Sequence, residues 1–396
     1  QNGRLIEAET LAISITKEFP LHQFAWKILG AVFKKTGRGS ESILIMRKSV
    51  QLSPQDAEAH NNLGVALQEL GRLKEAEVSY SNAINLEPNY IEAHCNLGNT
   101  FKDQGKLDKA IISYDKAILI NSDYAEAYYN KGLALKLLGK IEEAGENYTK
   151  AIELNADYAE AYNNLGNVFF EKGKTNEAIE AFKKSILINS DYADAHLNLS
   201  FVYLNSEMLQ EGLNEYEWRW KTNKFLSQQR QFSQPLWDGK ESLTEKRILL
   251  WSEQGIGDTI MWTSRLPLIM SQAKHCILEC QEKLIPLLEK SFPDIEIKPN
   301  NINNDKKRKD FDFHLPMGSL YGHFIKEILQ NRKVEAFLVP DPKRVKYWRK
   351  RLESIGNGLY IGVCWKSSGA SSQRIQNYSS INDWSPIFKI PNVIFI

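Results

Sequence analysis

Apolar residues recur at spacings of three and four through the first half of the chain, and the pattern itself repeats every 34 residues. Four consecutive segments of equal length carry it: 57–90, 91–124, 125–158 and 159–192. Within one segment, Ala59, Leu63 and Leu67 predict a first amphipathic helix. A second helix is predicted from about Lys74 to Leu86, and Pro88 stops it.

Small and aromatic residues occupy fixed positions in these segments. The recurring columns are Gly64, Gly98, Gly132 and Gly166; Gly71, Gly105, Gly139 and Gly173; Ala76, Ala110, Ala144 and Ala178; and Tyr80, Tyr114, Tyr148 and Phe182. The first column lets two helices approach closely, and the second permits a tight turn. A single helix pair cannot bury its apolar face alone, so the repeats are expected to stack into a solenoid.

These positions are those of the tetratricopeptide repeat family, which residues 1–222 resemble over about six repeats, the first partial and the last degenerate. The resemblance implies an all-α right-handed superhelix whose concave groove binds a peptide or a protein segment.

Asparagine forms a further column on the first helices, with members Asn62, Asn96, Asn130, Asn164 and Asn198. An amide both donates and accepts hydrogen bonds, so the column is suited either to binding an extended peptide backbone or to bonding the backbone of a neighbouring repeat and locking the stack. It resembles the asparagine ladder of O-linked N-acetylglucosamine transferases, which holds the acceptor polypeptide. Ile28 takes its place in the earliest full copy.

The period ends after Tyr203. The aromatic run Glu215–Trp220 is expected to cap the solenoid, and residues 223–246 to form a linker with Trp237 packed between domains. Short apolar strands then alternate with helices, which predicts a parallel, Rossmann-like sheet over residues 247–356. The expected strands are 248–251, 275–280, 295–297, 311–315 and 360–365, and the expected helices 259–270, 284–290 and 342–352. Residues 357–396 are expected to begin a second such half, and the chain is expected to be a fragment at both ends.

The turn after the first of these strands, Gly255–Asp258, is the first candidate for chemistry. Gly255 and Gly257 would let a phosphate approach the helix N-terminus behind them. Ile260 stands where a dinucleotide fingerprint has its third glycine, although Glu279 is spaced to hold a ribose. Asp258 is suited to taking a proton from an acceptor hydroxyl, and its alternative role is to cap the helix.

Two other stretches carry polar groups. Lys366, Ser367 and Arg374 follow the strand near residue 360 and could neutralise a diphosphate leaving group, unless they form an ordinary surface loop. Asp310 and Asp312 have a spacing that could hold a metal ion, but no metal site is predicted. The charged run 306–309 is expected to be solvated.

Residues 215–396 resemble bacterial tetratricopeptide proteins fused to a glycosyltransferase-like domain. The resemblance rests on EYEWRW, QPLWDG, SEQGIGDTIMWTSRLPLI, FDFHLPMGSL and IGVCWKSSG followed by Trp384. The GIGD element also resembles heptosyltransferase-like enzymes, in which the aspartate matching Asp258 is a proposed base. The resemblance implies a C-terminally truncated GT-B-type domain that takes a nucleotide sugar without a metal, with Lys366 and Arg374 near the donor.

Composition and charge argue against several classes of protein. A net charge of +1 argues against a nucleic-acid binder, and no apolar run reaches the roughly 18–20 residues that a bilayer requires. Four scattered cysteines predict thiols in a reducing, cytoplasmic setting: Cys95, Cys276, Cys280 and Cys364. The expected function is a solenoid that presents a polypeptide to a metal-independent, inverting glycosyltransferase with no cofactor. The alternative is a non-catalytic scaffold with a degenerate α/β domain.

Overall fold

The computed structural model describes residues 2–226, 228–301, 305–330 and 336–356, together with the strands 359–361 and 393–395. Its contacts divide the chain into two compact units, residues 1–227 and 228–396.

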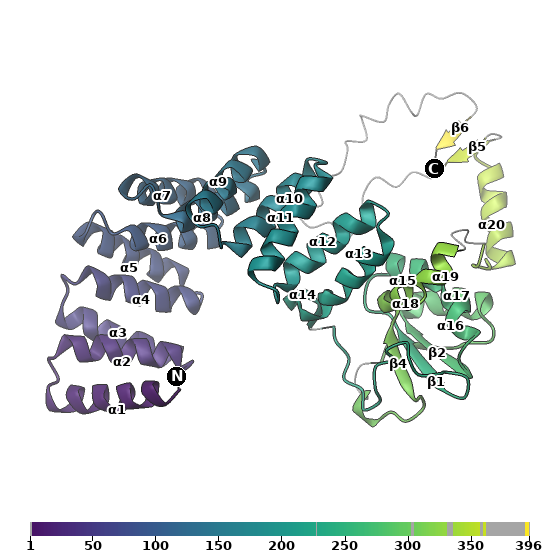
Figure 1. Ribbon diagram of the computed structural model, residues 1–396, viewed down its shortest axis with the longest axis horizontal. Coiled ribbons are helices and arrows are strands. Elements are labelled where there is room, and N and C mark those ends of the chain that lie inside the picture. The colour runs from purple at the N-terminus through teal and green to yellow at the C-terminus, as the bar shows by residue number, and fades with distance from the viewer. Residues whose placement is uncertain are drawn as a thin grey trace. The chain divides into compact units, whose positions relative to one another are not determined.

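The first unit is the predicted helical solenoid, in which each helix packs on the next one along the chain (Figure 1). The first helices of the successive repeats are α2 (Gln23–Lys35), α4 (Ala57–Glu69), α6 (Ile91–Asp103), α8 (Ala125–Leu137), α10 (Ala159–Glu171) and α12 (Ala193–Asn205). The second helices are α1 (Asn2–Glu18), α3 (Gly39–Leu52), α5 (Leu73–Leu86), α7 (Leu107–Ile120), α9 (Ile141–Leu154), α11 (Thr175–Ile188) and α13 (Leu209–Tyr216).

The repeating columns explain this packing. Tyr114 is completely buried, and its ring lies against Gly98 on the partner helix. The turn between two helices is made by a glycine such as Gly71, whose φ of 71° lies in the left-handed region that residues with a side chain rarely adopt. The glycine columns thus set both the distance between the helices and the turn that joins them.

The aromatic run Glu215–Trp220 closes the solenoid, as the sequence predicted. It forms the end of α13 and the 3-10 helix η1 (Glu217–Lys221), which the short α14 (Asn223–Leu226) follows. The ring of Trp218 stacks on His196 of α12, with centroids 3.8 Å apart. The aromatic run therefore covers the last repeat, where no further repeat follows in the described solenoid.

The second unit contains a four-stranded parallel sheet in the order β3-β2-β1-β4. Its strands are β1 (Arg247–Trp251), β2 (His275–Cys280), β3 (Glu296–Pro299) and β4 (Phe313–Pro316). Its helices are α15 (Ile256–Thr263), α16 (Leu266–Met270), α17 (Ile285–Ser291), α18 (Met317–His323), α19 (Ile325–Gln330) and α20 (Pro342–Glu353), with the 3-10 turns η2 (Glu282–Leu284) and η3 (Asp305–Lys307). The strands β5 (Leu359–Ile361) and β6 (Val393–Phe395) form a separate parallel pair. The small four-stranded parallel sheet is compatible with the predicted α/β class.

The two faces of the sheet have different coverings. Ile248 and Leu250 of β1 join a buried cluster with Trp262 of α15. Trp251 is covered instead by Phe232 and by His314 of β4. This alternation is the period of two expected of a strand, and it shows that residues preceding β1 cover one face of the sheet.

Two expectations from the sequence are wrong in detail. The single helix expected over 259–270 is two helices, because Pro267 has no N–H with which to continue the α15 ladder. Trp237 was expected between domains, but it is buried in the core of the second unit beside Phe324. The backbone N–H of Trp237 donates to the backbone carbonyl of His314 at 3.0 Å, so the residues around Trp237 pair with β4.

Candidate functional site

The asparagine column lies on consecutive first helices, α4 to α12, which contact one another directly, as α10 and α12 do. We call the surface formed by its five members the ladder face. Four of these side chains make the same kind of contact, because each Nδ2 donates to a side chain 35 positions earlier in the preceding repeat. The bonds are Asn96 to Asn61 Oδ1 at 3.1 Å, Asn130 to Cys95 Sγ at 3.6 Å, Asn164 to Tyr129 Oη at 3.1 Å, and Asn198 to Asn163 Oδ1 at 2.9 Å.

Asn62 is the exception in this column. Its Nδ2 lies 3.5 Å from Glu58 Oε1 on the same helix, so it has no support from an earlier repeat. The sequence left open whether the column locks the stack by bonding the backbone of a neighbouring repeat. The other four members do join neighbouring repeats, but through side chains and not through the backbone. The sequence did not indicate that the acceptor always sits one residue before the ladder position.

The inter-repeat hydrogen bond uses only one N–H of each side-chain amide. Within residues 2–226, the Oδ1 atoms of the ladder asparagines accept no hydrogen bond. None of these atoms is both fully buried and without a hydrogen-bond partner. A primary amide has two N–H groups and one carbonyl oxygen. Each fastened side chain is therefore held in one orientation. Asn96, Asn164 and Asn198 are only partly buried and keep a donor and an acceptor available, whereas Asn130 is buried.

Tyr129 shows how one of these acceptors is maintained. A tyrosine hydroxyl is protonated at neutral pH, and burial raises the pKa of this phenol further, to about 12. The hydroxyl oxygen can then accept from Asn164 without introducing a charge into the stack.

The second candidate site is the turn between β1 and α15, at the carboxyl edge of the sheet. Asp258 is the third residue of α15, is partly exposed, and accepts from the N–H of Gly255 at 3.2 Å through Oδ2. This is the capping contact that the sequence offered as the alternative to a catalytic role. A side chain at Gly257 would meet nothing within 4 Å, so open space adjoins the turn there.

Side chains from neighbouring strand ends hold this turn in place. Gln281, after β2, donates to the carbonyl of Gln254 at 2.7 Å and accepts from Thr259 at 3.1 Å. Asn300, after β3, donates to the hydroxyl of Ser252 at 2.9 Å. Ends of parallel strands meet at one edge, and this is where α/β proteins place ligands.

Glu253 is a buried carboxyl group at the same edge, and sequence inspection missed it. It follows β1 and is close to Gly318 of α18, the helix that follows β4, because a Cβ on Gly318 would collide with its Oε1 atom. The strand order changes direction between these two strands. The pair Glu253 and Gly318 could not be found from the sequence, because their contact depends on which strands are neighbours.

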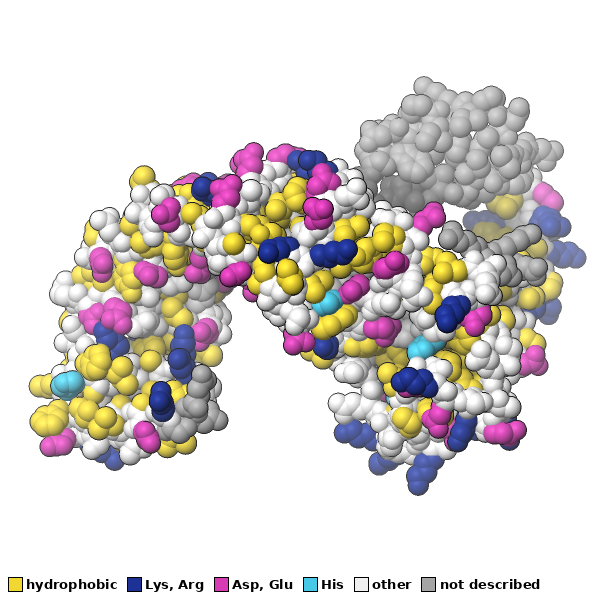
Figure 2. Space-filling view, in the orientation of Figure 1, with side chains coloured by type: hydrophobic (Ala, Val, Ile, Leu, Met, Phe, Trp, Pro, Cys, Tyr) yellow, Lys and Arg dark blue, Asp and Glu magenta, His cyan; other side chains and the backbone are white. Residues whose placement is uncertain are grey.

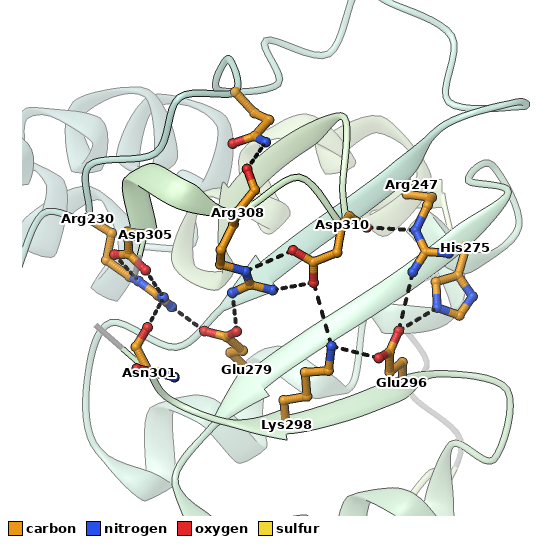
Figure 3. A network of polar contacts seen from close by, with 11 residues as sticks. Arg230, Arg247, His275, Glu279, Glu296, Lys298, Asn301, Asp305, Arg308 and Asp310 are labelled. Carbon is orange, nitrogen blue, oxygen red and sulfur yellow. Dashed lines mark hydrogen bonds and ion pairs between the residues drawn. The ribbon is translucent and has the colours of Figure 1, made fainter. Parts of the chain in front are cut away.

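A polar network covers the other face of the sheet and accounts for Glu279 (Figure 3). Glu279 is only 2% exposed, and its carboxylate binds Arg230 at 2.6 Å and also binds Arg308. Arg230 also contacts Asp305. The ribose-binding role considered for Glu279 is therefore not available, because both of its oxygens are engaged by arginines.

Arg308 corrects a further expectation. The charged run 306–309 was expected to be solvated, yet the side chain of Arg308 is only 13% exposed and bridges Glu279 and Asp310. The guanidinium group lowers the pKa of Asp310 to about 2. The carboxylates of Asp310 and Asp312 have different partners, since that of Asp310 binds Arg308 and that of Asp312 accepts from the backbone N–H of Arg247 at 2.8 Å. In the described part of the chain no group of His, Cys, Asp or Glu is arranged to hold a metal ion.

Three predicted donor-binding residues, Lys366, Ser367 and Arg374, lie outside the described residues. The thiols of Cys95, Cys276 and Cys280 are free and buried. None of the helices in the described ranges is both long enough and apolar enough to cross a bilayer.

Comparison with known proteins identifies the repeats. Residues 67–105, 98–139, 132–173 and 166–206 match the family model described as TPR repeat, and residues 45–78 match the one described as Tetratricopeptide repeat. Protein FlbA of Caulobacter vibrioides (strain ATCC 19089 / CIP 103742 / CB 15) is 30% identical over 202 residues, which cover 47% of this chain and 33% of FlbA. The chain thus spans about a third of the length of this relative.

Solved structures agree with the fold of the first unit. The APC/C hetero-tetramer Cut9-Hcn1 matches with a TM-score of 0.50 and 16% identity, covering 57% of this chain and 44% of that one. A crystal structure of MamA matches with a TM-score of 0.37 and 28% identity, covering 42% of this chain and 98% of that one. The family models that match residues 45–206 show that the first unit is a tetratricopeptide repeat solenoid, and the fold of Cut9-Hcn1 agrees with this.

Proposed function

We propose that the solenoid binds an extended polypeptide along the ladder face. The observation that carries the proposal is the partial use of each fastened amide, which leaves an acceptor and a donor at the same position of successive repeats. A peptide backbone also offers one N–H and one C=O per residue. Regularly spaced amides can therefore bind any extended sequence through its main chain.

The inter-repeat bonds also favour binding energetically. A side chain that is already fixed in the free protein loses less conformational entropy when a ligand arrives. Asn96, Asn164 and Asn198 are each held in this way before any peptide binds. The family match supports the same role, because binding of peptides or proteins is the property that the tetratricopeptide resemblance implies.

The test uses one peptide selected on the full chain from a display library of random peptides, with affinities measured by fluorescence anisotropy. The triple variant Asn96→Ala/Asn164→Ala/Asn198→Ala is expected to weaken binding about tenfold or more. N-methylation of the peptide backbone is expected to do the same, because it removes the main-chain donors.

The matched control replaces three asparagines on second helices, Asn82, Asn147 and Asn176, with alanine. It should change the affinity by less than about twofold. Equal losses in the two triple variants would show that the ladder face is not where the peptide binds.

For the second unit we infer a candidate activity in sugar transfer from a nucleotide sugar, with Asp258 accepting the proton of the acceptor hydroxyl. Three observations support this activity: Asp258 is partly exposed, its carboxylate accepts one hydrogen bond, from the N–H of Gly255, and it lies at the carboxyl edge of a parallel sheet. Lys366, Ser367 and Arg374 remain the predicted partners of the donor diphosphate. The rival proposal is a binding scaffold without catalysis.

Asp258→Asn separates these alternatives, because asparagine can still accept from the Gly255 N–H but cannot take up a proton. Transfer from nucleotide sugars should fall about a hundredfold or more if the carboxylate is the base. Equal transfer by both proteins would remove Asp258 from the mechanism. Titration calorimetry with UDP and GDP would show whether the α/β unit binds a nucleotide at all.

A further inference from the structure

Helix α20 is an unusually basic and exposed element. None of its twelve residues is buried, and it carries six cations: Lys343, Arg344, Lys346, Arg349, Lys350 and Arg351. Within the described residues, none of these side chains forms an ion pair with a carboxylate. Figure 2 shows the Lys and Arg side chains gathered over this helix. This concentration of unpaired positive charge contrasts with the near-neutral chain as a whole.

Three apolar side chains of α20 gather on one face of the helix. Val345, Trp348 and Leu352 are three and four positions apart, so they share that face. They line a groove of about 1050 Å³ opposite Leu287 of α17 and Pro340. Trp348 is 52% exposed, so the groove has a wide, accessible apolar lining.

Cations form the rim of the groove. Lys283, Lys290, Arg344 and Arg349 line it, against two carboxylates, Asp341 and Glu353. Asp341 is already engaged, because it accepts from the backbone N–H groups of Lys343 and Arg344 as the N-cap of α20. The groove therefore combines an apolar floor with a net positive edge.

The segment before α20 is anchored, which gives the groove a defined wall. Phe337 packs against Phe292 at the end of α17, with ring centroids 6.3 Å apart. The N–H of Val339 donates to the hydroxyl of Ser291 at 2.9 Å. These contacts fix the start of α20 relative to α17.

We propose that this groove binds an acidic amphipathic helix of a partner protein. Apolar side chains at three- and four-residue spacing would occupy the floor, and Asp or Glu residues between them would pair with the cationic rim. Laying an amphipathic helix into an apolar groove is a common mode of peptide recognition, and opposite charges at the rim steer the approach and set the specificity.

Other occupants fit less well. Residues 362–392 of this chain contain one acid, Asp383, against Lys366, Arg374 and Lys389, so their charge does not complement the rim. A bilayer requires an apolar face that projects from the surface, whereas Val345 and Trp348 line a concave space. Nucleic acid would use the cations but would leave the aliphatic floor without a partner.

The test selects helical peptides from a random display library on the full chain, with counter-selection on the variant Arg344→Glu/Arg349→Glu/Trp348→Ala. Selected peptides should be enriched in acids flanking an amphipathic apolar pattern. Their affinity by anisotropy should fall about tenfold or more for the triple variant and for copies with Gln in place of Glu.

The matched control for Arg344→Glu/Arg349→Glu is Lys343→Glu/Lys350→Glu, which reverses two charges outside the groove. It should lower the affinity for the peptides by less than about threefold. Equal losses in Arg344→Glu/Arg349→Glu and in this control would overturn the proposal, as would selected peptides with no excess of acids. The proposal also fails if single-stranded RNA, or phosphatidylcholine vesicles containing phosphatidylserine, bind more tightly than the peptides through the same residues. Circular dichroism of each variant checks folding, which these exposed positions should leave unchanged.

Discussion

The ring of Tyr114 occupies the space in which Gly98 would carry a side chain. A Cβ at position 98 would come within 2.5 Å of Tyr114 Cε1, closer than packed carbon atoms ever stand. Gly98→Ala should therefore destabilise the solenoid by about 1–3 kcal/mol, although alanine favours helix. Urea unfolding followed by circular dichroism measures the change in the free energy of unfolding.

A double-mutant cycle tests the cause of that loss. In a Tyr114→Ala background the ring is absent, so adding Gly98→Ala should cost little or even stabilise the helix. An unchanged penalty in that background would show that Tyr114 is not the source.

The inter-repeat amide bonds should contribute measurably to stability. Asn164→Ala removes one hydrogen bond to Tyr129 and is expected to cost about 1 kcal/mol. Asn62→Ala is the matched comparison, because the Asn62 side chain forms a hydrogen bond only to Glu58 of its own helix within the described residues, and its cost should be close to zero. Similar urea midpoints for the two variants would argue against a fastening role for the ladder.

The buried carboxylate of Glu279 should be far more sensitive than an exposed one. Glu279→Gln leaves Arg230 and Arg308 without their shared partner and should destabilise the α/β unit by about 3–5 kcal/mol. Glu296→Gln, at a carboxylate whose side chain is 36% exposed, should cost less than about 1 kcal/mol. Hydrogen exchange at the amides of β2 reports both effects, and equal protection in the two variants would contradict the expectation.

The imidazole of His314 should make the α/β unit sensitive to mild acid. Burial, with the nearby charge of Arg230, lowers its pKa from about 6.5 to about 4. Between pH 6.5 and pH 4 the histidine is protonated in the unfolded chain but not in the folded protein. The free energy of unfolding therefore has its full value above about pH 6.5 and falls as the pH drops toward 4. The loss should reach at most about 3 kcal/mol.

His314→Gln provides the control for this pH dependence. The variant should show a much flatter stability between pH 6.5 and 4 by hydrogen exchange at β1 and β4. Loss of the Asp310 ion pair belongs to lower pH, because the pKa of that carboxyl is about 2 against an ordinary 3.8. A slope unchanged by the substitution would assign the acid sensitivity to other groups.

The sequence predicted the solenoid well because its information is periodic. Gly98 and Tyr114 belong to columns that recur every 34 residues, so each copy supports the others. The strands of the second unit were also recognisable from short apolar runs such as 248–251. The strand β2 has the predicted bounds, and the boundaries of β1, β3 and β4 shifted by one or two residues, as expected where ends depend on tertiary contacts.

What the sequence could not provide was contact between distant positions. Arg230 and Glu279 are 49 residues apart, and Arg230 stood in a stretch interpreted as a linker. Glu253 meets Gly318 only because β1 and β4 are neighbours. Each residue is unremarkable in its own segment, and only the strand order brings the partners together.

The ladder bonds have a consequence for how this protein can change in length. Each fastened asparagine depends on a side chain one repeat and one residue earlier, and on nothing farther away. Duplicating or deleting a whole 34-residue block would recreate the same junction on either side. A solenoid of this kind can therefore gain or lose ladder asparagines one whole repeat at a time during evolution, without changes to the copies that remain.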